Sequence, residues 1–437
     1  MSVWKSFKSL YFATLLMLLG SGLLSTYLAL HVAERADGIW VGALMTGFYL
    51  GLVLGGKIGH RLIARVGHIR AYVASAGIVT GAVLVHGLTE NLPAWLGLRV
   101  LVGLGMMTMY MVLESWLNEQ STSEERGVVF SGYMMASYLG SVLGQLVLVA
   151  IPELSITLLL LVGLCFALCL VPVALTRRIH PDPLHPAPLE PRYFFQRVPS
   201  SMITSLIAGA MVGAFYGLAP LYASRIGLPT QMIGLFMGVC IVASLLIQAP
   251  LGWLSDRIDR PTLIRFISGT LMIVALPQAI LIDLPILLIF IGSGLSAVLF
   301  FSLYPLAVAF ANDNVEAEKR VSLTAVLLTT FGIGASISPL VIGAIMKHYG
   351  PGMLYASISI LALLIVLRVR HPQSESETEA ICVSDEAPLQ HISMPDGISS
   401  SPLAAALDPR VEESHVQEQM QDCPLSEVAE ESEEQHY

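Results

Sequence analysis

Long apolar runs separated by short polar segments dominate this chain from about residue 10 to residue 368. A helix needs about 20 consecutive apolar residues to cross about 30 Å of hydrocarbon. The apolar runs cover residues 10–32, 40–59, 71–89, 94–117, 128–151, 154–175, 201–223, 231–253, 262–282, 284–310, 321–346 and 351–368. The pattern therefore predicts an all-α integral membrane protein with twelve transmembrane helices.

The two halves of the chain repeat one another in parallel. The repeated pairs, 192 or 194 residues apart, are Gly42 and Gly234, Arg65 and Arg257, Tyr110 and Tyr304, Asn118 and Asn312, and Arg126 and Arg320. A parallel repeat of apolar helices is typical of transporters built as two similar bundles with a cleft between them. We therefore expect two six-helix bundles, residues 1–175 and residues 201–370.

The composition agrees with a membrane protein. The chain is 55% hydrophobic and 13% charged, with a mean hydropathy of +0.72, which lies outside the range of soluble globular proteins. Lys5 and Lys8 before the first run resemble the start of a secretory signal. That run exceeds the apolar core of such a signal, and no small-x-small cleavage site follows it. We therefore expect the first run to remain as a span.

Basic residues predict the orientation in the membrane. With the N-terminus inside, 18 Lys and Arg fall on cytoplasmic segments, and only Arg35, Arg225 and Lys347 fall outside. Lys and Arg accumulate on the cytoplasmic side of membrane proteins. Both termini are therefore expected in the cytoplasm.

Two segments lack the apolar pattern. Residues 176–200 contain five prolines between positions 181 and 191, which predicts an extended cytoplasmic linker that cannot be a span. Residues 371–437 carry sixteen acidic residues against Arg410, which predicts an acidic, disordered cytoplasmic tail. The alternative for this tail is a partner-binding or regulatory segment. The whole chain contains five cysteines, and they imply no disulfide framework.

A charged motif follows the eighth run, where residues 252–260 read Gly-Trp-Leu-Ser-Asp-Arg-Ile-Asp-Arg. This segment resembles the Gly-x-Leu-x-Asp-Arg-x-Gly-Arg loop of the major facilitator superfamily, and the resemblance covers roughly residues 5–370. Within the superfamily the chain is most similar to the YcaD-like bacterial branch. The resemblance implies a secondary transporter of the bacterial inner membrane that works by alternating access as a monomer.

The resemblance also assigns a gate to the two copies of this loop. The predicted gating residues are Arg65, Gly67, Glu114, Gly252, Asp256, Arg257 and Arg260. Ion pairs from such a loop to the neighbouring helix can hold an inner gate closed. The first copy has Ala64 where the family has Asp, so Glu114 or Glu119 is the candidate for the missing carboxylate. The alternative is that these charges only anchor the loops at the membrane surface.

Arg99 is the one clearly embedded charge. Followed by Gly103, it resembles the Arg-x-x-x-Gly motif of the family's fourth helix. A charge buried in a span costs several kcal/mol unless it faces water or a partner. We expect Arg99 to line the substrate pathway, the alternative being a structural hydrogen bond to a helix carbonyl. The resemblance implies that exporters of cationic drugs in this family carry an acid in or near the first helix and a Gly-Pro pair in the fifth. This chain has neither in those runs, and Arg99 is the embedded charge, so an anionic or polar neutral substrate is favoured over a cation.

Further polar residues complete the predicted pathway. The full set is Arg99, Tyr110, Tyr138, Gln145, Tyr216, Gln248 and Tyr304. For any one of the uncharged residues, the alternative is a satisfied hydrogen bond between helices. Ala136, Gly140 and Gly144 in the fifth run are interpreted instead as a packing stripe of small residues.

No catalytic function competes with transport. The eleven His do not form metal-ligand spacings, and no phosphate loop or nucleophile motif occurs. We therefore expect neither an enzyme, nor a metal site, nor a cofactor, nor nucleic-acid binding. The expected partners are a small-molecule substrate and the lipid bilayer, with protons as a candidate coupling ion.

Three functions remain open at this point. The favoured one is a secondary active transporter, with export preferred to uptake. The second is a membrane sensor or scaffold built on a transporter fold, with the acidic tail as its output. The third, a membrane-embedded enzyme, would need clustered His, Asp or Glu that the spans do not supply.

Overall fold

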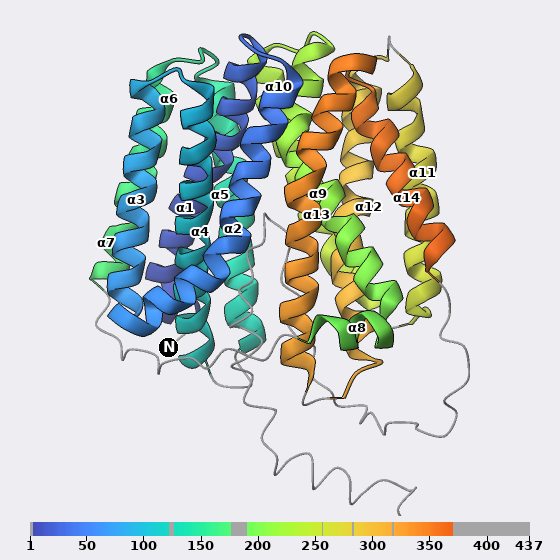
Figure 1. Cartoon of the computed structure of the whole chain (residues 1–437), viewed down its shortest axis with the longest axis horizontal. Coiled ribbons are helices and arrows are strands. Elements are labelled where there is room, and N and C mark those ends of the chain that lie inside the picture. Colours follow the sequence, from blue (N-terminus) through green and yellow to red (C-terminus); the bar gives the residue numbers. More distant parts are fainter. Residues whose placement is uncertain are drawn as a thin grey trace, which may run out of the picture.

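The computed structural model describes residues 3–121, 126–175, 190–255, 257–281, 284–316 and 319–369. Within these ranges the regular structure is helical (Figure 1). The predicted acidic tail 371–437 lies outside the described residues, as do Asp256 and most of the predicted linker.

Each predicted apolar run corresponds to a helix. In the first half the helices are α1 (Val3–Ala33), α2 (Gly38–Val66), α3 (His68–Leu88), α4 (Leu92–Glu119), α5 (Arg126–Ala150), α6 (Ile156–Leu168) and α7 (Leu170–Ala174). In the second half they are α9 (Pro199–Arg225), α10 (Thr230–Ser255), α11 (Arg260–Ile280), α12 (Ile286–Asn312), α13 (Arg320–Tyr349) and α14 (Met353–Arg368). The predicted all-α membrane fold is confirmed.

Eleven helices in the described part of the chain are long and apolar enough to cross a membrane. One of them is the continuous stretch Ile156–Ala174, formed by α6 and α7 together. The twelfth predicted span corresponds to α14, which has only 16 residues. It is apolar and occupies the expected place, but it is shorter than the others.

The linker between the halves differs in part from the extended segment that the prolines predict. A short helix, α8 (Pro191–Arg197), precedes α9. Pro191 and Pro199 stand at the first turns of these two helices, where proline's missing N–H removes no helical hydrogen bond. Tyr193 of α8 lies against Lys319, whose ammonium is 4.0 Å from the ring centroid. Proline therefore starts helices here.

The two halves are packed in the same way, and they stand side by side in Figure 1. In the first half α1 packs against α5 and α2 against α4. In the second half α9 packs against α13 and α10 against α12, which are the equivalent pairs. The repeat in the sequence is therefore a repeat of helix packing.

Small residues explain why these pairs approach closely. A Cβ on Gly140 or Gly144 would lie 2.4 or 2.6 Å from the carbonyl oxygens of Leu15 and Leu19, which confirms the predicted packing stripe of α5 against α1. On α2, Gly51 meets α4, and its Cβ would lie 2.2 Å from the Val100 oxygen. Glycine at such points lets backbones touch inside a membrane, where packing holds helices together.

The outer surface of the bundles is apolar, as a lipid-facing surface must be. Large apolar side chains stand exposed on the helices, among them Leu246, Phe266, Leu287 and Ile360. On a protein surrounded by water such a surface would be a docking site or would cause aggregation. Here it faces hydrocarbon.

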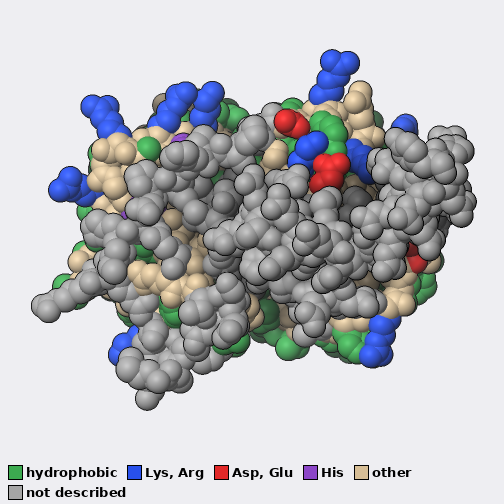
Figure 2. Space-filling view, turned by 90° about the horizontal axis from the view of Figure 1, so that it is seen from below, with side chains coloured by type: hydrophobic (Ala, Val, Ile, Leu, Met, Phe, Trp, Pro, Cys, Tyr) green, Lys and Arg blue, Asp and Glu red, His purple; other side chains and the backbone are tan. Residues whose placement is uncertain are grey.

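The helices run between two opposite ends of the molecule. The terminal face is the end at which α1 begins and α14 ends, and the distal face is the opposite end. Figure 2 shows the terminal face, with Lys and Arg side chains standing around both halves. Arg61, Arg65 and Arg70, near the α2–α3 turn, are exposed there.

The halves pack tightly toward the distal face. A Cβ on Gly42 of α2 would lie 2.1 Å from the Pro339 oxygen of α13, and one on Gly343 would lie 2.6 Å from the Gly38 oxygen. A Cβ on Gly234 of α10 would lie 2.7 Å from the Gln145 oxygen of α5. Each of these glycines lies within about 12 Å of the distal helix ends, at 1.5 Å per residue. The halves are therefore closed together on the distal side.

Candidate functional site: a central cavity beside Arg99

A cavity lies between the halves below the distal closure. Its walls come from α1, α2, α4 and α5 of the first half and from α9 and α10 of the second. The lining residues are Leu18, Ser21, Gly22, Ser25, Thr26, Met45, Phe48, Tyr49, Tyr110, Ser141, Gln145, Tyr216 and Ile241. Its volume of about 50 Å³ holds a few water molecules.

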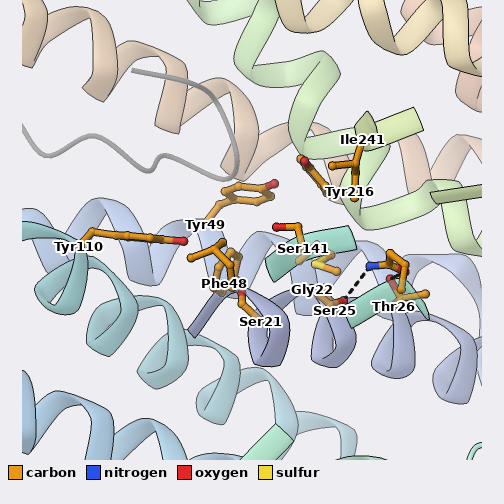
Figure 3. Close-up of a pocket in the computed structure, with 13 residues that line it drawn as sticks. Ser21, Gly22, Ser25, Thr26, Phe48, Tyr49, Tyr110, Ser141, Tyr216 and Ile241 are labelled. Atoms are coloured by element: carbon orange, nitrogen blue, oxygen red, sulfur yellow. Dashed lines mark hydrogen bonds between the residues drawn. The ribbon is translucent and has the colours of Figure 1, made fainter. Parts of the chain in front are cut away.

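Hydroxyl groups give the cavity its polar character. Tyr110, Tyr49 and Ser141 point into the same space from the first half, and Tyr216 and Ile241 face them from the second (Figure 3). No acidic side chain is among the described residues that line it. Hydroxyls both donate and accept hydrogen bonds. The walls therefore suit a polar solute.

Arg99 of α4 lies directly behind this wall. Its side chain is fully buried. Nη2 donates to Ser25 Oγ at 3.3 Å and lies 3.3 Å from Met45 Sδ. The guanidinium carbon is 4.5 Å from the centroid of the Phe48 ring. All three contacts are to residues that line the cavity, so Arg99 reaches the cavity through them.

The guanidinium of Arg99 is only partly satisfied. Nε and Nη1 are buried and have no hydrogen-bond partner among the described residues. A buried donor without a partner costs about 1–3 kcal/mol, and a charged one costs more. The predicted alternative, a structural hydrogen bond to a helix carbonyl, is not among the hydrogen bonds that Arg99 makes. Arg99 thus holds a positive charge that is only partly compensated next to the cavity.

Gln145 lines the cavity but is held by α1. Thr26 Oγ1 donates to Gln145 Oε1 at 3.0 Å, and Gln145 Nε2 donates to the Gly22 oxygen at 3.3 Å. These bonds connect α5 to α1 within the first half. The side chain therefore shapes the wall while retaining one amide hydrogen for a ligand.

Three other predicted pathway residues lie away from the cavity lining. Gln248 Nε2 of α10 donates to the Tyr138 hydroxyl of α5 at 3.2 Å, which joins the two halves. Tyr304 is buried in the second half, where its ring lies 4.8 Å from that of Phe331. Its hydroxyl has no partner among the described residues. The cavity thus unites Tyr110, Gln145 and Tyr216 with Arg99 behind them.

The predicted gating residues of the first half lie in two different places, at the surface and in the core. Arg65, before the positive-φ residue Gly67 (φ 85°), is exposed at the terminal face. Glu114 is buried, and it accepts a hydrogen bond from the Tyr133 hydroxyl of α5 at 3.1 Å. Gly67 ends α2, and a side chain there would strain its backbone.

In the second half, Arg260 connects two helices at the terminal face. It begins α11, donates to the Ala309 oxygen of α12 at 2.8 Å and pairs with Asp313. Arg257 instead lies on the ring of Trp253, at 3.7 Å from the centroid. Gly252 is helical with open space beside it, and Asp256 lies outside the described residues.

An ion pair that the sequence did not point to crosses the distal closure. Lys347 Nζ of α13 lies 2.7 Å from an Asp37 oxygen at the start of α2. Both side chains are partly exposed, at 37% and 56%. The pair therefore adds a small, salt-sensitive attraction between the halves.

Sequence reasoning also missed part of the cavity lining. Ser21, Ser25 and Thr26 on α1, with Phe48 and Tyr49 on α2, line it. The four-residue spacing of Ser21 and Ser25 places both on one helix face, which is the signal that was available. Nothing in α2 distinguishes Phe48 and Tyr49 from core aromatic residues.

Similarity to known proteins agrees with this architecture. The model of the Major Facilitator Superfamily matches residues 10–304. The chain belongs to the major facilitator superfamily. It is thus a member of a family of membrane transporters, as its charged loops predict.

Relatives place the chain within this superfamily. It is 29% identical over 367 residues to an uncharacterized MFS-type transporter of Enterobacter sp. (strain 638), covering 81% of this chain and 93% of the relative. It is also 29% identical over 364 residues to the uncharacterized MFS-type transporter YcaD of Salmonella enteritidis PT4, with the same coverage. The predicted YcaD-like branch is confirmed.

Solved structures share the fold. The nucleoside transporter NupG aligns with a TM-score of 0.70 at 14% identity, covering 82% of this chain and 96% of NupG. A bacterial homolog of the human lysosomal transporter Spinster, solved inward-facing and occupied, aligns with a TM-score of 0.64 at 16% identity, covering 84% and 96%. This superfamily member therefore has the fold of a secondary transporter.

Proposed function

We propose that this protein is a secondary active transporter that moves a small anionic or polar neutral solute through the central cavity by alternating access. The observation that carries the proposal is the partly unpaired guanidinium of Arg99 behind the cavity wall. A buried charge in a membrane bundle is costly unless function uses it.

Charge favours an anion over a cation. The described lining contains hydroxyls, one amide and aromatic rings but no carboxylate. Arg99 would repel a cation across this short distance, whereas its two unpartnered nitrogens, Nε and Nη1, can donate to a carboxylate or phosphate oxygen after a small rearrangement. A polar neutral solute with carbonyl groups would also satisfy them.

The asymmetry between the two faces supports alternating access. The closure of α2 on α13 and of α10 on α5 lies toward the distal face. Rocking the halves about the cavity would exchange this closure for one at the terminal face. We propose that the bundles 1–175 and 201–370 are the moving bodies, joined by the linker 176–200.

The proposed orientation follows the basic residues. Lys and Arg surround the terminal face (Figure 2), so this face is cytoplasmic if the positive-inside rule applies. Both termini would then be cytoplasmic in the bacterial inner membrane, and the closed distal face would be outside. Export is the proposed direction, on the sequence prediction alone, and monomeric function is proposed from the family resemblance.

A thermal-shift panel on the purified protein tests the proposed substrate class. Carboxylates, phosphates, neutral polar metabolites and cationic antimicrobials are compared on the wild type and on Arg99→Gln. A ligand at a hundredfold excess over its Kd stabilises the protein by about 2.7 kcal/mol. We expect hits among anions or neutral polar solutes, and we expect Arg99→Gln to lose them.

The control is Tyr304→Phe, which removes one buried hydroxyl in the second half, away from the cavity lining. It should keep every hit. Hits confined to cationic compounds, or anionic hits that survive in Arg99→Gln, would contradict the proposal. Uptake into vesicles loaded or unloaded with the identified solute then tests the direction.

A further inference from the structure

Two histidines and a tryptophan form a buried cluster next to Arg99, toward the distal face. The Trp95 ring of α4 lies 5.6 Å from the His31 ring of α1 and 5.4 Å from the His86 ring of α3, between centroids. Tyr27 stacks on His31 at 5.3 Å. We call His31, His86 and Trp95 the histidine cluster. None of its members lines the cavity.

Both histidines have a ring nitrogen that is not used. His86 Nδ1 lies 2.7 Å from the Ala82 oxygen. Because a carbonyl oxygen only accepts, Nδ1 carries the hydrogen, and Nε2 of the neutral ring is a bare acceptor. His86 Nε2 is buried without a partner among the described residues, as is His31 Nδ1. The neutral ring of either histidine can therefore bind one further proton.

Trp95 is placed to stabilise the charged form. Its Nε1 donates to the Thr89 oxygen at 2.6 Å, which holds the indole in place. A cation within about 6 Å of a tryptophan centroid is attracted to the ring face. A protonated imidazole on either side of Trp95 therefore recovers part of the cost of burying its charge.

The charged groups around His31 lie at the distal surface. Glu34, Arg35 and Glu90 act on it electrostatically. Arg35 and Glu90 form an exposed ion pair that joins the end of α1 to the α3–α4 turn. The hydrogen bond from Arg35 lowers the pKa of the Glu90 carboxyl below its usual value, so this carboxylate stays ionised while the histidines titrate. His31 is half-buried and is the natural entry from solvent.

The surroundings of His86 differ from those of His31, because another charged group acts on it. Arg99, one helical turn beyond Trp95 on α4, acts on it electrostatically. From α6, the apolar residues Ile156 and Leu159 pack at Gly87, the neighbour of His86 in the sequence. Among the described residues, Arg99 is therefore the charge that repels a proton on His86. An anion held by Arg99 would offset both charges.

We propose that the histidine cluster binds a proton, which enters from the distal face through His31, and that this proton and an anion at Arg99 stabilise one another. This inference rests on the proposed function, and it names the proton as the coupling ion. Because coupling between two bound ligands is reciprocal, a proton that strengthens anion binding is itself bound more tightly when the anion is present.

Tryptophan fluorescence tests the site without any solute, because a protonated imidazole in contact with an indole quenches it. The chain contains five tryptophans, and the difference between the wild type and Trp95→Phe isolates Trp95. We expect acid quenching of Trp95 as the pH is lowered from about 8 to about 4, a range wide enough for a buried histidine. The quenching should be absent in the double variant His31→Gln/His86→Gln. His348→Gln, at an exposed residue of α13, should retain it.

Quenching that persists in the double variant, or a Trp95 signal that does not change over this range, would overturn the proton site. Should the double variant fold poorly by circular dichroism, His86→Gln alone decides, because it removes the buried imidazole next to Arg99. In Arg99→Gln the midpoint should rise by about half a pH unit or more, since a nearby positive charge is gone. An unchanged midpoint would overturn the coupling to Arg99.

These outcomes are separable from those of the proposed function. The fluorescence titration uses no transported solute, so a silent ligand panel leaves it readable. A titrating cluster together with hits that do not depend on Arg99 would retain the proton site and reject the anion site.

Discussion

The two halves of this protein share one scaffold but differ in chemistry at equivalent positions. His86 and Arg99 of the first half correspond, 192 and 194 residues later, to Gln278 and Ser293. In the second half Ser293 Oγ donates to Gln278 Oε1, and Tyr355 donates to Ser293 Oγ, each at 2.7 Å. That network is uncharged and its members bond to one another, whereas Arg99 keeps two nitrogens, Nε and Nη1, without a partner among the described residues.

The two halves therefore agree in the residues that pack the helices and differ in the residues around the cavity. The repeat preserves the residues that allow helices to touch, and the halves depart from each other where a ligand would bind. Eleven of the thirteen lining residues belong to the first half, and only Tyr216 and Ile241 come from the second. The first half is therefore the better candidate for the binding half, with the second as the wall that closes on it.

The largest expected effect on ligand binding comes from substituting Arg99, whose equivalent in the second half is Ser293. Arg99→Gln should weaken binding of an anionic ligand by about a hundredfold, or ~2.7 kcal/mol, for the loss of a charged hydrogen-bonding partner. It should leave the melting temperature without ligand unchanged or higher, because an unpaired buried charge is removed.

Ser293→Ala is the matched variant in the second half. It should lower stability by about 1–2 kcal/mol by leaving Gln278 and Tyr355 with a lost partner, with ligand affinity unchanged. Melting curves with and without ligand check both variants. If Ser293→Ala weakened binding as much as Arg99→Gln, the division of labour between the halves would be wrong.

The next largest effect distinguishes packing within a half from packing between halves. Gly51→Ala places a methyl 2.2 Å from the Val100 oxygen of α4 and should destabilise the first half by about 1–3 kcal/mol through overpacking. Gly42→Ala makes an equally close contact, 2.1 Å, but with Pro339 of the other half. That contact can be relieved by separating the halves.

We therefore expect Gly51→Ala to lower the melting temperature and Gly42→Ala to open the distal face instead. Spin labels at the exposed positions Glu90 and Tyr349, in a background without native cysteines, report that separation by pulsed EPR. An unchanged distance distribution in Gly42→Ala, with a melting temperature as low as that of Gly51→Ala, would show that the distal closure does not open.

A smaller effect should separate two arginines of the charged loop. Arg260→Gln removes the hydrogen bond to Ala309 and the pair with Asp313, and it should cost about 1 kcal/mol as a partly buried charged interaction. Arg257→Gln removes only a contact with an exposed Trp253, and its cost should be within about 0.5 kcal/mol. Chemical denaturation of both variants measures the difference, and equal losses would count against Arg260 as the tie between α11 and α12.

The smallest effect concerns the ion pair of the distal closure. Asp37→Asn or Lys347→Met should weaken the closure by about 0.2–1 kcal/mol, as for a partly exposed pair. The same EPR distances should shift modestly, and high salt should abolish the difference from the wild type. The exchange of both charges, Asp37→Lys with Lys347→Asp, should restore the closed distribution. A shift that is independent of salt would argue against an electrostatic role.

The helices could be predicted from the sequence because their signal is local. Each span is a long apolar run, and the length of such a run is dictated by the thickness of the bilayer. The stripe at Gly140 and Gly144 was also predictable, because residues four apart share a helix face and glycine there indicates close packing. Both predictions needed only one helix at a time.

The lining of the cavity could be predicted only in part because it depends on several helices at once. Tyr110 and Tyr304 occupy equivalent places in the repeat, yet Tyr110 lines the cavity and Tyr304 packs on Phe331. What decides between them is the set of neighbouring side chains, which the spacing within one helix does not contain. The pair of Asp37 and Lys347 lies even further from sequence reasoning, since 310 residues separate its members.

The short helix α14 carries a consequence for the membrane itself. Its 16 residues extend about 24 Å at 1.5 Å per residue, against about 30 Å of hydrocarbon. The neighbouring α11, which it packs against, has 21 residues. A bilayer compensates for a short apolar segment by thinning locally, at a cost of fractions of a kcal/mol per Å. We therefore expect the lipid leaflets to be thinner at this one edge of the second half, so that the thickness of the bilayer acts on one bundle more than on the other.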